Sequence, residues 1–598
     1  MPATCQHTAH RGQILVIFAA ATVLLIAFLA AAVDVGYLLS QRRGVQNAAD
    51  AAALAVAHAV HSGVTNTATL EQIAAYYVEE NGYDATPEIT FSPDMKQVRV
   101  TVNAEVPKFF VGLVYPGDWK VGARAAASLE PVPFDAALLA LNPSSGGIKT
   151  SGSTGIEVTG GSVMSNYTIE TSGSTSIIAD QQVNANDGFR ESGASRIEGG
   201  MGTNPYAPEV PDPLKDKIQP PTMPPFPNNP VPNVGGSPQQ CMEYPQPWGV
   251  NIYTVPAGTY SGGGGNCLTI QNVQSGNTLE FAHGNYRFNN GAGISIGGGN
   301  NGPIVLRGGN YTFNGGPGIS VGGSTPDFRM ERGNYAFLNG ARLSIGGSAN
   351  GNVLGGGTFY FSGAGSGILP GGSNSVTLNP GTYIFDGGHG MVFSGSSHLT
   401  FNPGHYEFWF RNGANLSFSG SSTIRLNGDV YVKMYFYDGS SLLTSGSTHF
   451  NLPSGEYYFG GNPPRDTCKL QNSGSTWIGG RNIFLFFGPG CYLHTSGSAA
   501  FAFTAPTTSI YPGYHPGVFM YAHPDNTETF QWNGTTSMLS EGTVYLPSAK
   551  LTMGGASNGK VLRGQIIVNS MQTGGSTRLG LEYQQYVDTS IPAVFLIE

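Results

Sequence analysis

Charged side chains are scarce in this sequence of 598 residues. Asp, Glu, Lys and Arg make up 11% of it, the net charge is −9, and no run of Lys or Arg exceeds two residues. A nucleic-acid-binding protein needs clustered basic side chains to neutralise phosphates. The composition therefore argues against a nucleic-acid partner. The chain also lacks the high charge that keeps a disordered protein unfolded.

Cysteine is rare as well, with five residues in the whole chain. No Cys-x-x-Cys pair occurs, which argues against a zinc site. Cys5 precedes a long apolar run, and the other four cysteines lie far beyond it, at Cys241, Cys267, Cys468 and Cys491. In an exported region, four cysteines can form two disulfides with three connectivities.

One apolar run is long enough to cross a membrane. Ile14 to Val33 are 20 residues without a charge, bounded by Arg11 and Asp34. As a helix they span about 30 Å, the thickness of a bilayer core. We expect a cytoplasmic tail over 1–12, a transmembrane helix over 13–35 and an Ala-rich stalk helix over 36–62. The alternative is a cleaved signal peptide that ends near Ala30-Ala31-Ala32.

Three motifs around this run resemble a known family. They are Arg11-Gly12-Gln13, Val33-Asp34-Val35-Gly36 and the Ala-rich string QNAADAAALA that starts at Gln46. Together they are similar to the N-terminal segment of the Tad/Flp-type pilus-assembly proteins (TadE/TadG-like). The positions that carry the resemblance are Asp34, Gly36, Gln46, Asn47 and Asp50. The resemblance implies a single-pass inner-membrane protein with a cytoplasmic N-terminus, a body in the periplasm or on the surface, and other pilus-assembly or envelope proteins as partners.

A small α+β domain is expected over 63–133. Thr69-Leu70-Glu71-Gln72 is a capping-box pattern that begins a helix, and Gly82 ends it. Alternating Val residues predict strands over 88–91 and 97–106, and a third strand over 121–129 completes the sheet.

The pattern Gly-x-aromatic-x-Phe repeats along the rest of the chain. Its intervals are 25, 24, 24, 24 and 23 residues, and its six clear copies start at Gly284, Gly309, Gly333, Gly357, Gly381 and Gly404. Each interval also holds two shorter apolar stretches between Gly, Asn and Ser turns. Three strands in about 24 residues predict one coil of a parallel β-helix, taken to be right-handed, with its aromatic side chains stacked inside.

Ser-Gly-Ser motifs extend the predicted coils beyond this array. They start at Ser151 and Ser172 on one side and at Ser445, Ser473 and Ser496 on the other. We expect first coils over 134–203, and a main array with C-terminal coils over 251–598. The segment 204–250 between them holds 14 prolines, so it is a spacer or a strap along the solenoid.

The coil length also suggests a disulfide pairing. Cys241 and Cys267 are 26 residues apart, and Cys468 and Cys491 are 23 apart. Residues one coil apart lie on adjacent rungs, within disulfide reach. We therefore favour these two pairs.

Catalytic chemistry is hard to locate on the predicted coils. Polysaccharide-cleaving sites need carboxylates on neighbouring rungs, yet only eight acidic residues lie between Gly258 and Gly460, and none repeats on the next rung. The best metal-ligand group is Asp386 with His389, His398 and His405, although lone surface histidines are commoner than ligands. We expect no cofactor, no metal and no enzyme activity.

Two exposed-aromatic candidates remain. Trp409 and Tyr431 either form a glycan-stacking face or belong to the core.

The leading hypothesis is a non-catalytic, membrane-anchored component of a Tad/Flp-type pilus-assembly or secretion system that presents a β-solenoid. The alternatives are an adhesin-like β-helix that binds glycan or an envelope protein, and a polysaccharide-active enzyme.

Overall fold

The computed structural model describes most of the chain in two compact units. The described residues are 13–61, 63–113, 117, 119–132, 134–244, 251–263, 265–324, 327–349, 351–460, 467–508, 515–534, 538–555 and 559–597. The N-terminal unit comprises the described parts of 1–134 and 590–598, and the solenoid unit comprises those of 135–589. Most elements are strands, and the N-terminal unit also contains one long apolar helix, as the sequence predicts.

The N-terminal unit packs one half of a long helix on a small antiparallel sheet. Helix α1 is continuous over Gln13–His61, and α2 follows over Thr67–Glu80. The sheet order is β1-β2-β3-β52, with β1 at Glu88–Phe91, β2 at Gln97–Glu105, β3 at Lys120–Val132 and β52 at Ile591–Leu596. A short 3₁₀ helix, η1, covers Val111–Leu113. Asn66 caps α2 by accepting hydrogen bonds from the Ala68 and Thr69 amides.

Strand β52 departs from the predicted domain limits, which assigned all of 251–598 to coils. Val132 pairs with Ile591, and the ladder runs antiparallel to Ala127 and Leu596. The strand therefore completes the N-terminal sheet, because β3 would otherwise leave a row of backbone groups unpaired. Its apolar sequence resembles that of a coil strand, so nothing local predicts its distant partner. The solenoid unit is consequently an insertion between β3 and β52.

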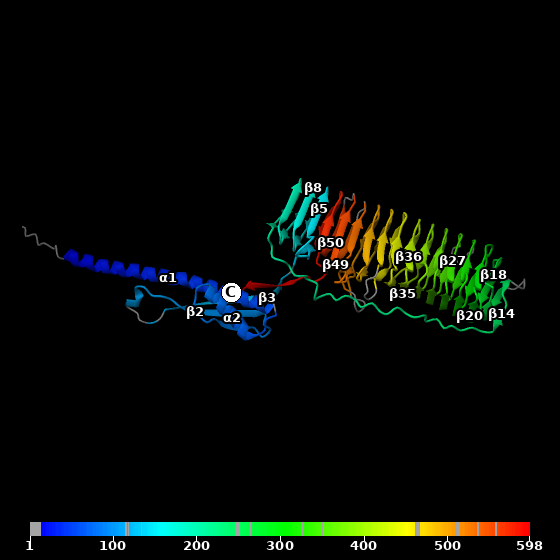
Figure 1. Cartoon of the computed structure of the whole chain (residues 1–598), viewed down its shortest axis with the longest axis horizontal. Coiled ribbons are helices and arrows are strands. Elements are labelled where there is room, and N and C mark those ends of the chain that lie inside the picture. The colour runs from blue at the N-terminus through cyan, green and yellow to red at the C-terminus, as the bar shows by residue number, and fades with distance from the viewer. Residues whose placement is uncertain are drawn as a thin grey trace, which may run out of the picture. The chain divides into compact units, whose positions relative to one another are not determined.

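The coils of the solenoid are built from strands on three faces, and Figure 1 shows them stacked along this unit. The first face holds the aromatic motif, at β14 (Pro238–Gln239), β17 (Gly258–Ser261), β20 (Gly284–Asn289), β23 (Gly309–Asn314), β26 (Gly333–Leu338), β29 (Gly357–Ser362), β32 (Gly381–Asp386), β35 (Gly404–Arg411), β38 (Val430–Phe436), β41 (Ser454–Phe459), β44 (Ile483–Phe487) and β47 (Val518–Ala522). The second face holds β15 (Met242–Tyr244), β18 (Asn266–Ile270), β21 (Gly293–Ile296), β24 (Ile319–Val321), β27 (Arg342–Ile345), β30 (Gly367–Pro370), β33 (Gly390–Phe393), β36 (Asn415–Phe418), β39 (Leu442–Thr444), β42 (Lys469–Asn472), β45 (Tyr492–Thr495) and β48 (Thr529–Asn533).

The third face is divided. An eight-stranded parallel sheet holds β16 (Ile252–Val255), β19 (Thr278–Phe281), β22 (Ile304–Leu306), β25 (Phe328–Met330), β28 (Asn352–Leu354), β31 (Ser375–Leu378), β34 (His398–Phe401) and β37 (Thr423–Leu426). A separate three-stranded sheet holds β40 (His449–Asn451), β43 (Trp477–Gly480) and β46 (Ala500–Phe503). Within the described residues, the ladder stops at β37 and starts again at β40.

The first coils in sequence stack on the last ones. The C-terminal coils are built from β49 (Met538–Gly554), β50 (Lys560–Thr573) and β51 (Arg578–Glu582). The coils that come first are built from β4 (Ala136–Ala140), β5 (Ile148–Gly152), β6 (Gly155–Thr159), β7 (Ser162–Ser165), β8 (Ile169–Gly173), β9 (Ser176–Ala179), β10 (Gln182–Ala185), β11 (Phe189–Gly193), β12 (Arg196–Gly199) and β13 (Gly202–Asn204). Ile148 pairs with Met571, and Leu579 pairs with Ile156. The solenoid therefore continues from β50 and β51 into β4, β5 and β6.

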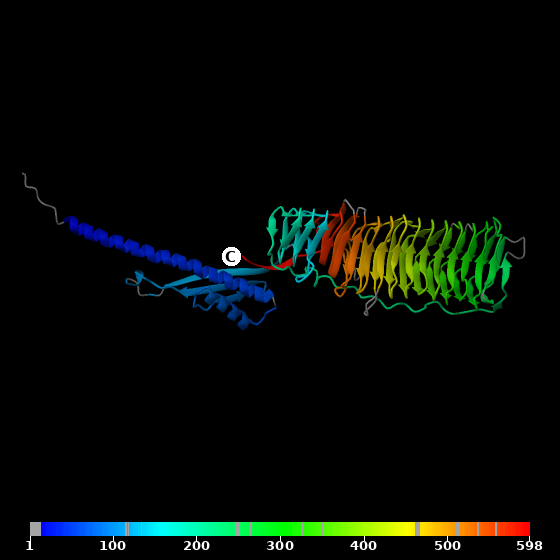
Figure 2. The ribbon, with the colours of Figure 1, turned by 45° about the horizontal axis from the view of Figure 1, so that its top comes forward.

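The proline-rich segment is a strap along the solenoid rather than a free spacer. Figure 2 shows it following the coils within that unit. At one end, Asp212 accepts a hydrogen bond from Tyr545 Oη at 2.8 Å. At the other, Thr259 Oγ1 donates to Gly236 O at 2.8 Å. Its length carries the chain from the outermost first coil to the opposite end, where the main array begins.

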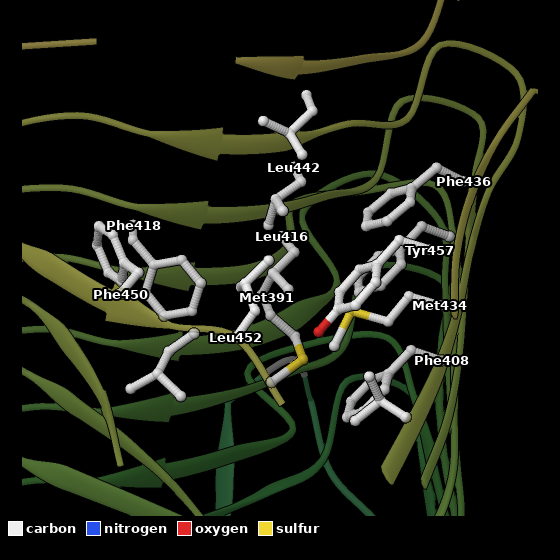
Figure 3. Packing of buried hydrophobic residues seen from close by; sticks show 14 of the residues in the cluster. Met391, Phe408, Leu416, Phe418, Met434, Phe436, Leu442, Phe450, Leu452 and Tyr457 are labelled. Carbon is white, nitrogen blue, oxygen red and sulfur yellow. The ribbon is translucent and has the colours of Figure 1, made fainter. Parts of the chain in front are cut away.

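Stacked aromatic rings fill the solenoid. Phe rings on the first face form a column with centroid separations of 4.6 to 5.0 Å, at Phe288, Phe313, Phe337, Phe361, Phe385, Phe410, Phe436, Phe459 and Phe487. Figure 3 shows side chains of the other two faces, such as Leu416 and Phe450, pointing toward this wall. The spacing matches the rise between hydrogen-bonded strands, so each coil adds one ring to the column.

Glycine allows the coils to approach closely at their turns. Gly575, Gly152 and Gly173 have φ between 78° and 93°. A Cβ on Gly152 would lie 2.5 Å from Gly575 O, and one on Gly173 would lie 2.5 Å from Gly152 O. The glycines of the Ser-Gly-Ser motifs at Ser151 and Ser172 thus stand in one column of turns with Gly575, and this column runs across the junction between the last and the first coils.

Candidate functional site

The first half of α1 has the properties of a membrane span. Its apolar side chains, such as Phe18, Leu25 and Phe28, are exposed in this unit. The segment is long and apolar enough to cross a membrane, by length and composition. The segment is therefore a membrane anchor. The structure continues the same helix without interruption from this segment into the stalk.

Asp34 lies where this apolar segment ends, and it is 1% exposed. Its Oδ2 accepts hydrogen bonds from the backbone amides of Phe110 and Val111, at the start of η1. The other oxygen, Oδ1, is buried without a hydrogen-bond partner among the described residues. A carboxylate at these amides holds residues 110 and 111 against the helix.

The loop presents aromatic side chains at this level of the helix. The Phe109 ring contacts Tyr37 of α1 edge-on, with centroids 5.0 Å apart. Phe109 and Phe110 are both about half exposed. Aromatic residues are enriched at membrane–water interfaces. Asp34 thus fixes an aromatic loop next to the end of the membrane anchor.

The Ala-rich part of α1 is the contact surface with the sheet. Ala49, Ala52 and Ala53 are fully buried in the core of this unit. Gln46 Nε2 donates to Asp50 Oδ1 at 2.8 Å and to Arg124 O of β3 at 3.0 Å. Small side chains let the helix backbone approach the strands, and Gln46 bridges the two. The QNAADAAALA string therefore encodes helix-on-sheet docking.

Two of the positions that carry the family resemblance, Asn47 and Gly36, do not take part in these contacts. Asn47 and Gly36 are exposed, and a Cβ on Gly36 would meet no atom within 4 Å. Gly44 lies outside the predicted motif, and the Tyr83 side chain packs directly on it, since a Cβ there would lie 1.9 Å from Tyr83 Oη. Tyr83 Oη in turn donates to Gln41 Oε1 at 3.1 Å.

Removing the Asp34 carboxylate should free the loop. We expect Asp34→Ala to raise the hydrogen-exchange rate of the Phe110 and Val111 amides at least tenfold. Charge-assisted hydrogen bonds contribute about 2 kcal/mol. Hydrogen-exchange mass spectrometry on the full chain in detergent measures this, with the exposed Asp84→Ala as control. Unchanged exchange in Asp34→Ala would show that the carboxylate does not hold the loop.

The cysteines of the solenoid lie on adjacent rungs. Cys241 and Cys267 are joined with a Cα–Cα distance of 4.6 Å, and Cys468 and Cys491 with one of 4.8 Å. The first pair ties the outermost coil of the main array to its neighbour. The second ties the turns next to β42 and β45.

The four residues of the metal-ligand group are not brought together. Asp386 accepts hydrogen bonds from Arg411 Nε and Asn412 Nδ2, both at 2.7 Å. The Arg411 hydrogen bond holds the pKa of Asp386 below its usual range. His398 Nδ1 lies 2.7 Å from Thr423 Oγ1 on the third face, and burial lowers the pKa of His398. His389 and His405 are exposed on separate turns and strands.

Trp409 faces outward from β35 and is nevertheless buried, because the strap covers it. Its ring contacts Phe226 of the strap at 6.0 Å and stacks on Tyr435 at 4.3 Å. Arg411 lies over the same Phe226 ring, 4.2 Å from its centroid. Trp409 therefore anchors the strap and is not an open stacking surface.

A groove of about 1120 Å³ opens beside β37 and β40, between the third and the first face. Tyr431 and His405 line one side, and their ring centroids are 5.6 Å apart. Trp477, Arg425 and Arg481 also line the groove. A second hollow of about 490 Å³ shares His405 and Tyr431. Of these residues, only Tyr431 and His405 stand out in the sequence, as an aromatic candidate and as a member of the predicted metal-ligand group. Trp477, Arg425 and Arg481 could not be predicted, because the outward positions of the third face follow no repeated motif.

Comparison with known proteins found one family whose model matches the N-terminal segment. Residues 12–59 match the model of a family described as "Putative Flp pilus-assembly TadE/G-like". The matched range includes Asp34, Gly36, Gln46, Asn47 and Asp50. No curated protein and no solved structure matches the chain.

Proposed function

From the likeness of residues 12–59 to the pilus-assembly family, we propose that this chain is a non-catalytic component of a Tad/Flp-type assembly or secretion system. It is anchored by one helix in the bacterial inner membrane with its N-terminus in the cytoplasm. The solenoid stands in the periplasm or at the cell surface, where it meets other pilus-assembly or envelope proteins.

The observation that carries this proposal is the structural use of the matched segment. Its apolar half forms the membrane anchor, Asp34 fixes the adjoining loop, and its Ala-rich half is the docking surface for the sheet. The two disulfides on adjacent rungs support a location outside the reducing cytoplasm.

Three glutamates of the coils, Glu280, Glu331 and Glu456, support a structural role. Arg307 pairs with Glu280 at 2.8 Å and with Glu331 at 2.6 Å. Glu456 is buried and accepts a hydrogen bond from Tyr431 Oη. Carboxylates held in this way link neighbouring rungs, whereas a general acid or base has to reach a substrate.

Protease access on cells tests the proposed location. With a C-terminal epitope tag, we expect the full-length protein in the inner-membrane fraction. Added protease should digest it in spheroplasts and spare it in intact cells if the body is periplasmic. Digestion in intact cells would place it at the surface. Resistance in spheroplasts, with digestion only after lysis, would contradict the orientation. A shortened soluble form would show that residues before Val33 are a cleaved signal peptide.

A further inference from the structure

The groove beside β37 and β40 exists because the coil wall is interrupted there. On the neighbouring rungs, Leu378 and Phe401 occupy inward positions and are at most 1% exposed. Leu426 takes the same position on the next rung, by its pairing with Phe401, and it is 37% exposed. The third-face ladder ends at this strand and resumes at β40 within the described residues. The groove thus reaches toward the core through a break in the sheet.

Small residues keep the groove open on the following rungs. Gly480 and Ala502 line it on β43 and β46, and Leu539 of β49 lies beyond them, 54% exposed. The lining comes from successive rungs, which are about 4.8 Å apart. An elongated depression that crosses several rungs suits a linear polymer better than a compact metabolite.

Trp477 gives the groove an aromatic wall. A Cβ on Gly479 would lie 2.5 Å from the Trp477 ring, so the indole lies over this glycine. His449 stacks on the same indole, with centroids 4.1 Å apart and planes within 16°. The two rings support each other across adjacent rungs. Such a planar, partly exposed surface can pack against the C–H face of a sugar ring.

The charge of the groove is positive within a negative chain. Arg425 and Arg481 line it and take part in no ion pair among the described residues, whereas Asp429 is its acidic lining residue. In the adjoining hollow, Arg332 lies with Glu407, and Lys433 pairs with the buried Glu456 at 3.7 Å. Arginine presents a planar fork of N–H donors that matches a carboxylate. Two arginines with no ion-pair partner in the described part of the chain therefore favour an anionic ligand at this groove.

We propose that this groove binds a linear acidic polysaccharide, with uronate carboxylates on Arg425 and Arg481 and a sugar ring on Trp477. The inference goes beyond the proposed function and does not depend on it. The site adds binding of an extracellular or envelope glycan to a membrane-anchored solenoid.

Binding of polygalacturonate to the full chain in zwitterionic nanodiscs tests the proposal, with dextran of matched length as the neutral control. Isothermal titration calorimetry should show saturable binding of polygalacturonate that weakens with salt, and none of dextran. The double variant Arg425→Ala, Arg481→Ala should weaken binding at least tenfold and reduce its salt dependence. Arg342→Ala, on the exposed second face, should bind like the wild type.

The aromatic wall has its own test. Trp477→Ala should weaken polygalacturonate binding at least tenfold, and Trp477→Tyr should stay within threefold of the wild type. Each variant is first shown by circular dichroism to keep the wild-type melting profile, and the conservative Tyr variant serves if the Ala variant fails to fold. The proposal would be overturned if dextran bound as tightly as polygalacturonate, or if the arginine variant and Trp477→Ala bound polygalacturonate as tightly as the wild type. It would also be overturned if the wild type bound neither polygalacturonate nor alginate, a second linear polyuronate.

Discussion

Gly357→Ala should destabilise the solenoid by about 3 kcal/mol or more, as expected when extra atoms are forced into a closely packed position. Gly357 has a φ of 91°. A Cβ there would lie 2.1 Å from Gly333 O on the preceding rung. That oxygen belongs to the backbone of a hydrogen-bonded strand, so it cannot move away without loss of the ladder pairing between β26 and β29.

Gly413→Ala is the matched control for this variant. Gly413 has a similar φ of 77°, yet a Cβ there would meet no atom within 4 Å. It should therefore cost only the strain of a left-handed alanine, about 1 kcal/mol. Urea unfolding of both variants, followed by circular dichroism, separates backbone conformation from rung contact. Equal midpoints would show that the close approach of coils does not determine stability.

Phe385→Ala should cost about 4 kcal/mol, in the range for removal of a buried aromatic side chain. The Phe385 ring is fully buried between Phe361 and Phe410, with centroids 5.0 and 4.9 Å away. Its removal leaves a gap in a continuous column, and stacked neighbours on rigid rungs cannot collapse into it.

Phe385→Leu distinguishes ring stacking from burial at the same position. It retains most of the apolar volume, so we expect a loss of about 1.5 kcal/mol. The measurement is again the urea midpoint, with far-ultraviolet circular dichroism to confirm β content. If Phe385→Ala unfolds at the wild-type urea concentration, the column does not stabilise the coils.

The sequence predicts the coils well because their physical cause is local and repeated. Every Gly-x-aromatic-x-Phe copy places two side chains on one face of a strand, and the rings of successive copies stack as expected. The long helix was predictable for the same reason, since an unbroken apolar run and an alanine-rich run need no distant partner. The handedness of the coils stays a prediction.

The order of the coils was not predictable, because Ser-Gly-Ser turns are alike wherever they occur. Nothing in residues 148–152 indicates that they pair with β50, more than 400 positions away. The same holds for β52, whose partner is β3. Trp477 and Arg481 of the groove could not be predicted from the aromatic motif, because that motif lies on the first face. The outward side chains of the third face follow no repeated pattern.

Because the solenoid is inserted between β3 and β52, both units can complete their folding only when the C-terminal part of the chain has been synthesised. Residues 136–204 are synthesised first, but β5 and β6 have no inner neighbours until β50 and β51 emerge. At about 5–20 residues per second, that wait lasts on the order of tens of seconds. The N-terminal sheet likewise lacks its edge strand until Ile591–Leu596 arrives. A chain that stops short of residue 560 would leave open strands in both units, where quality-control proteases could recognise it.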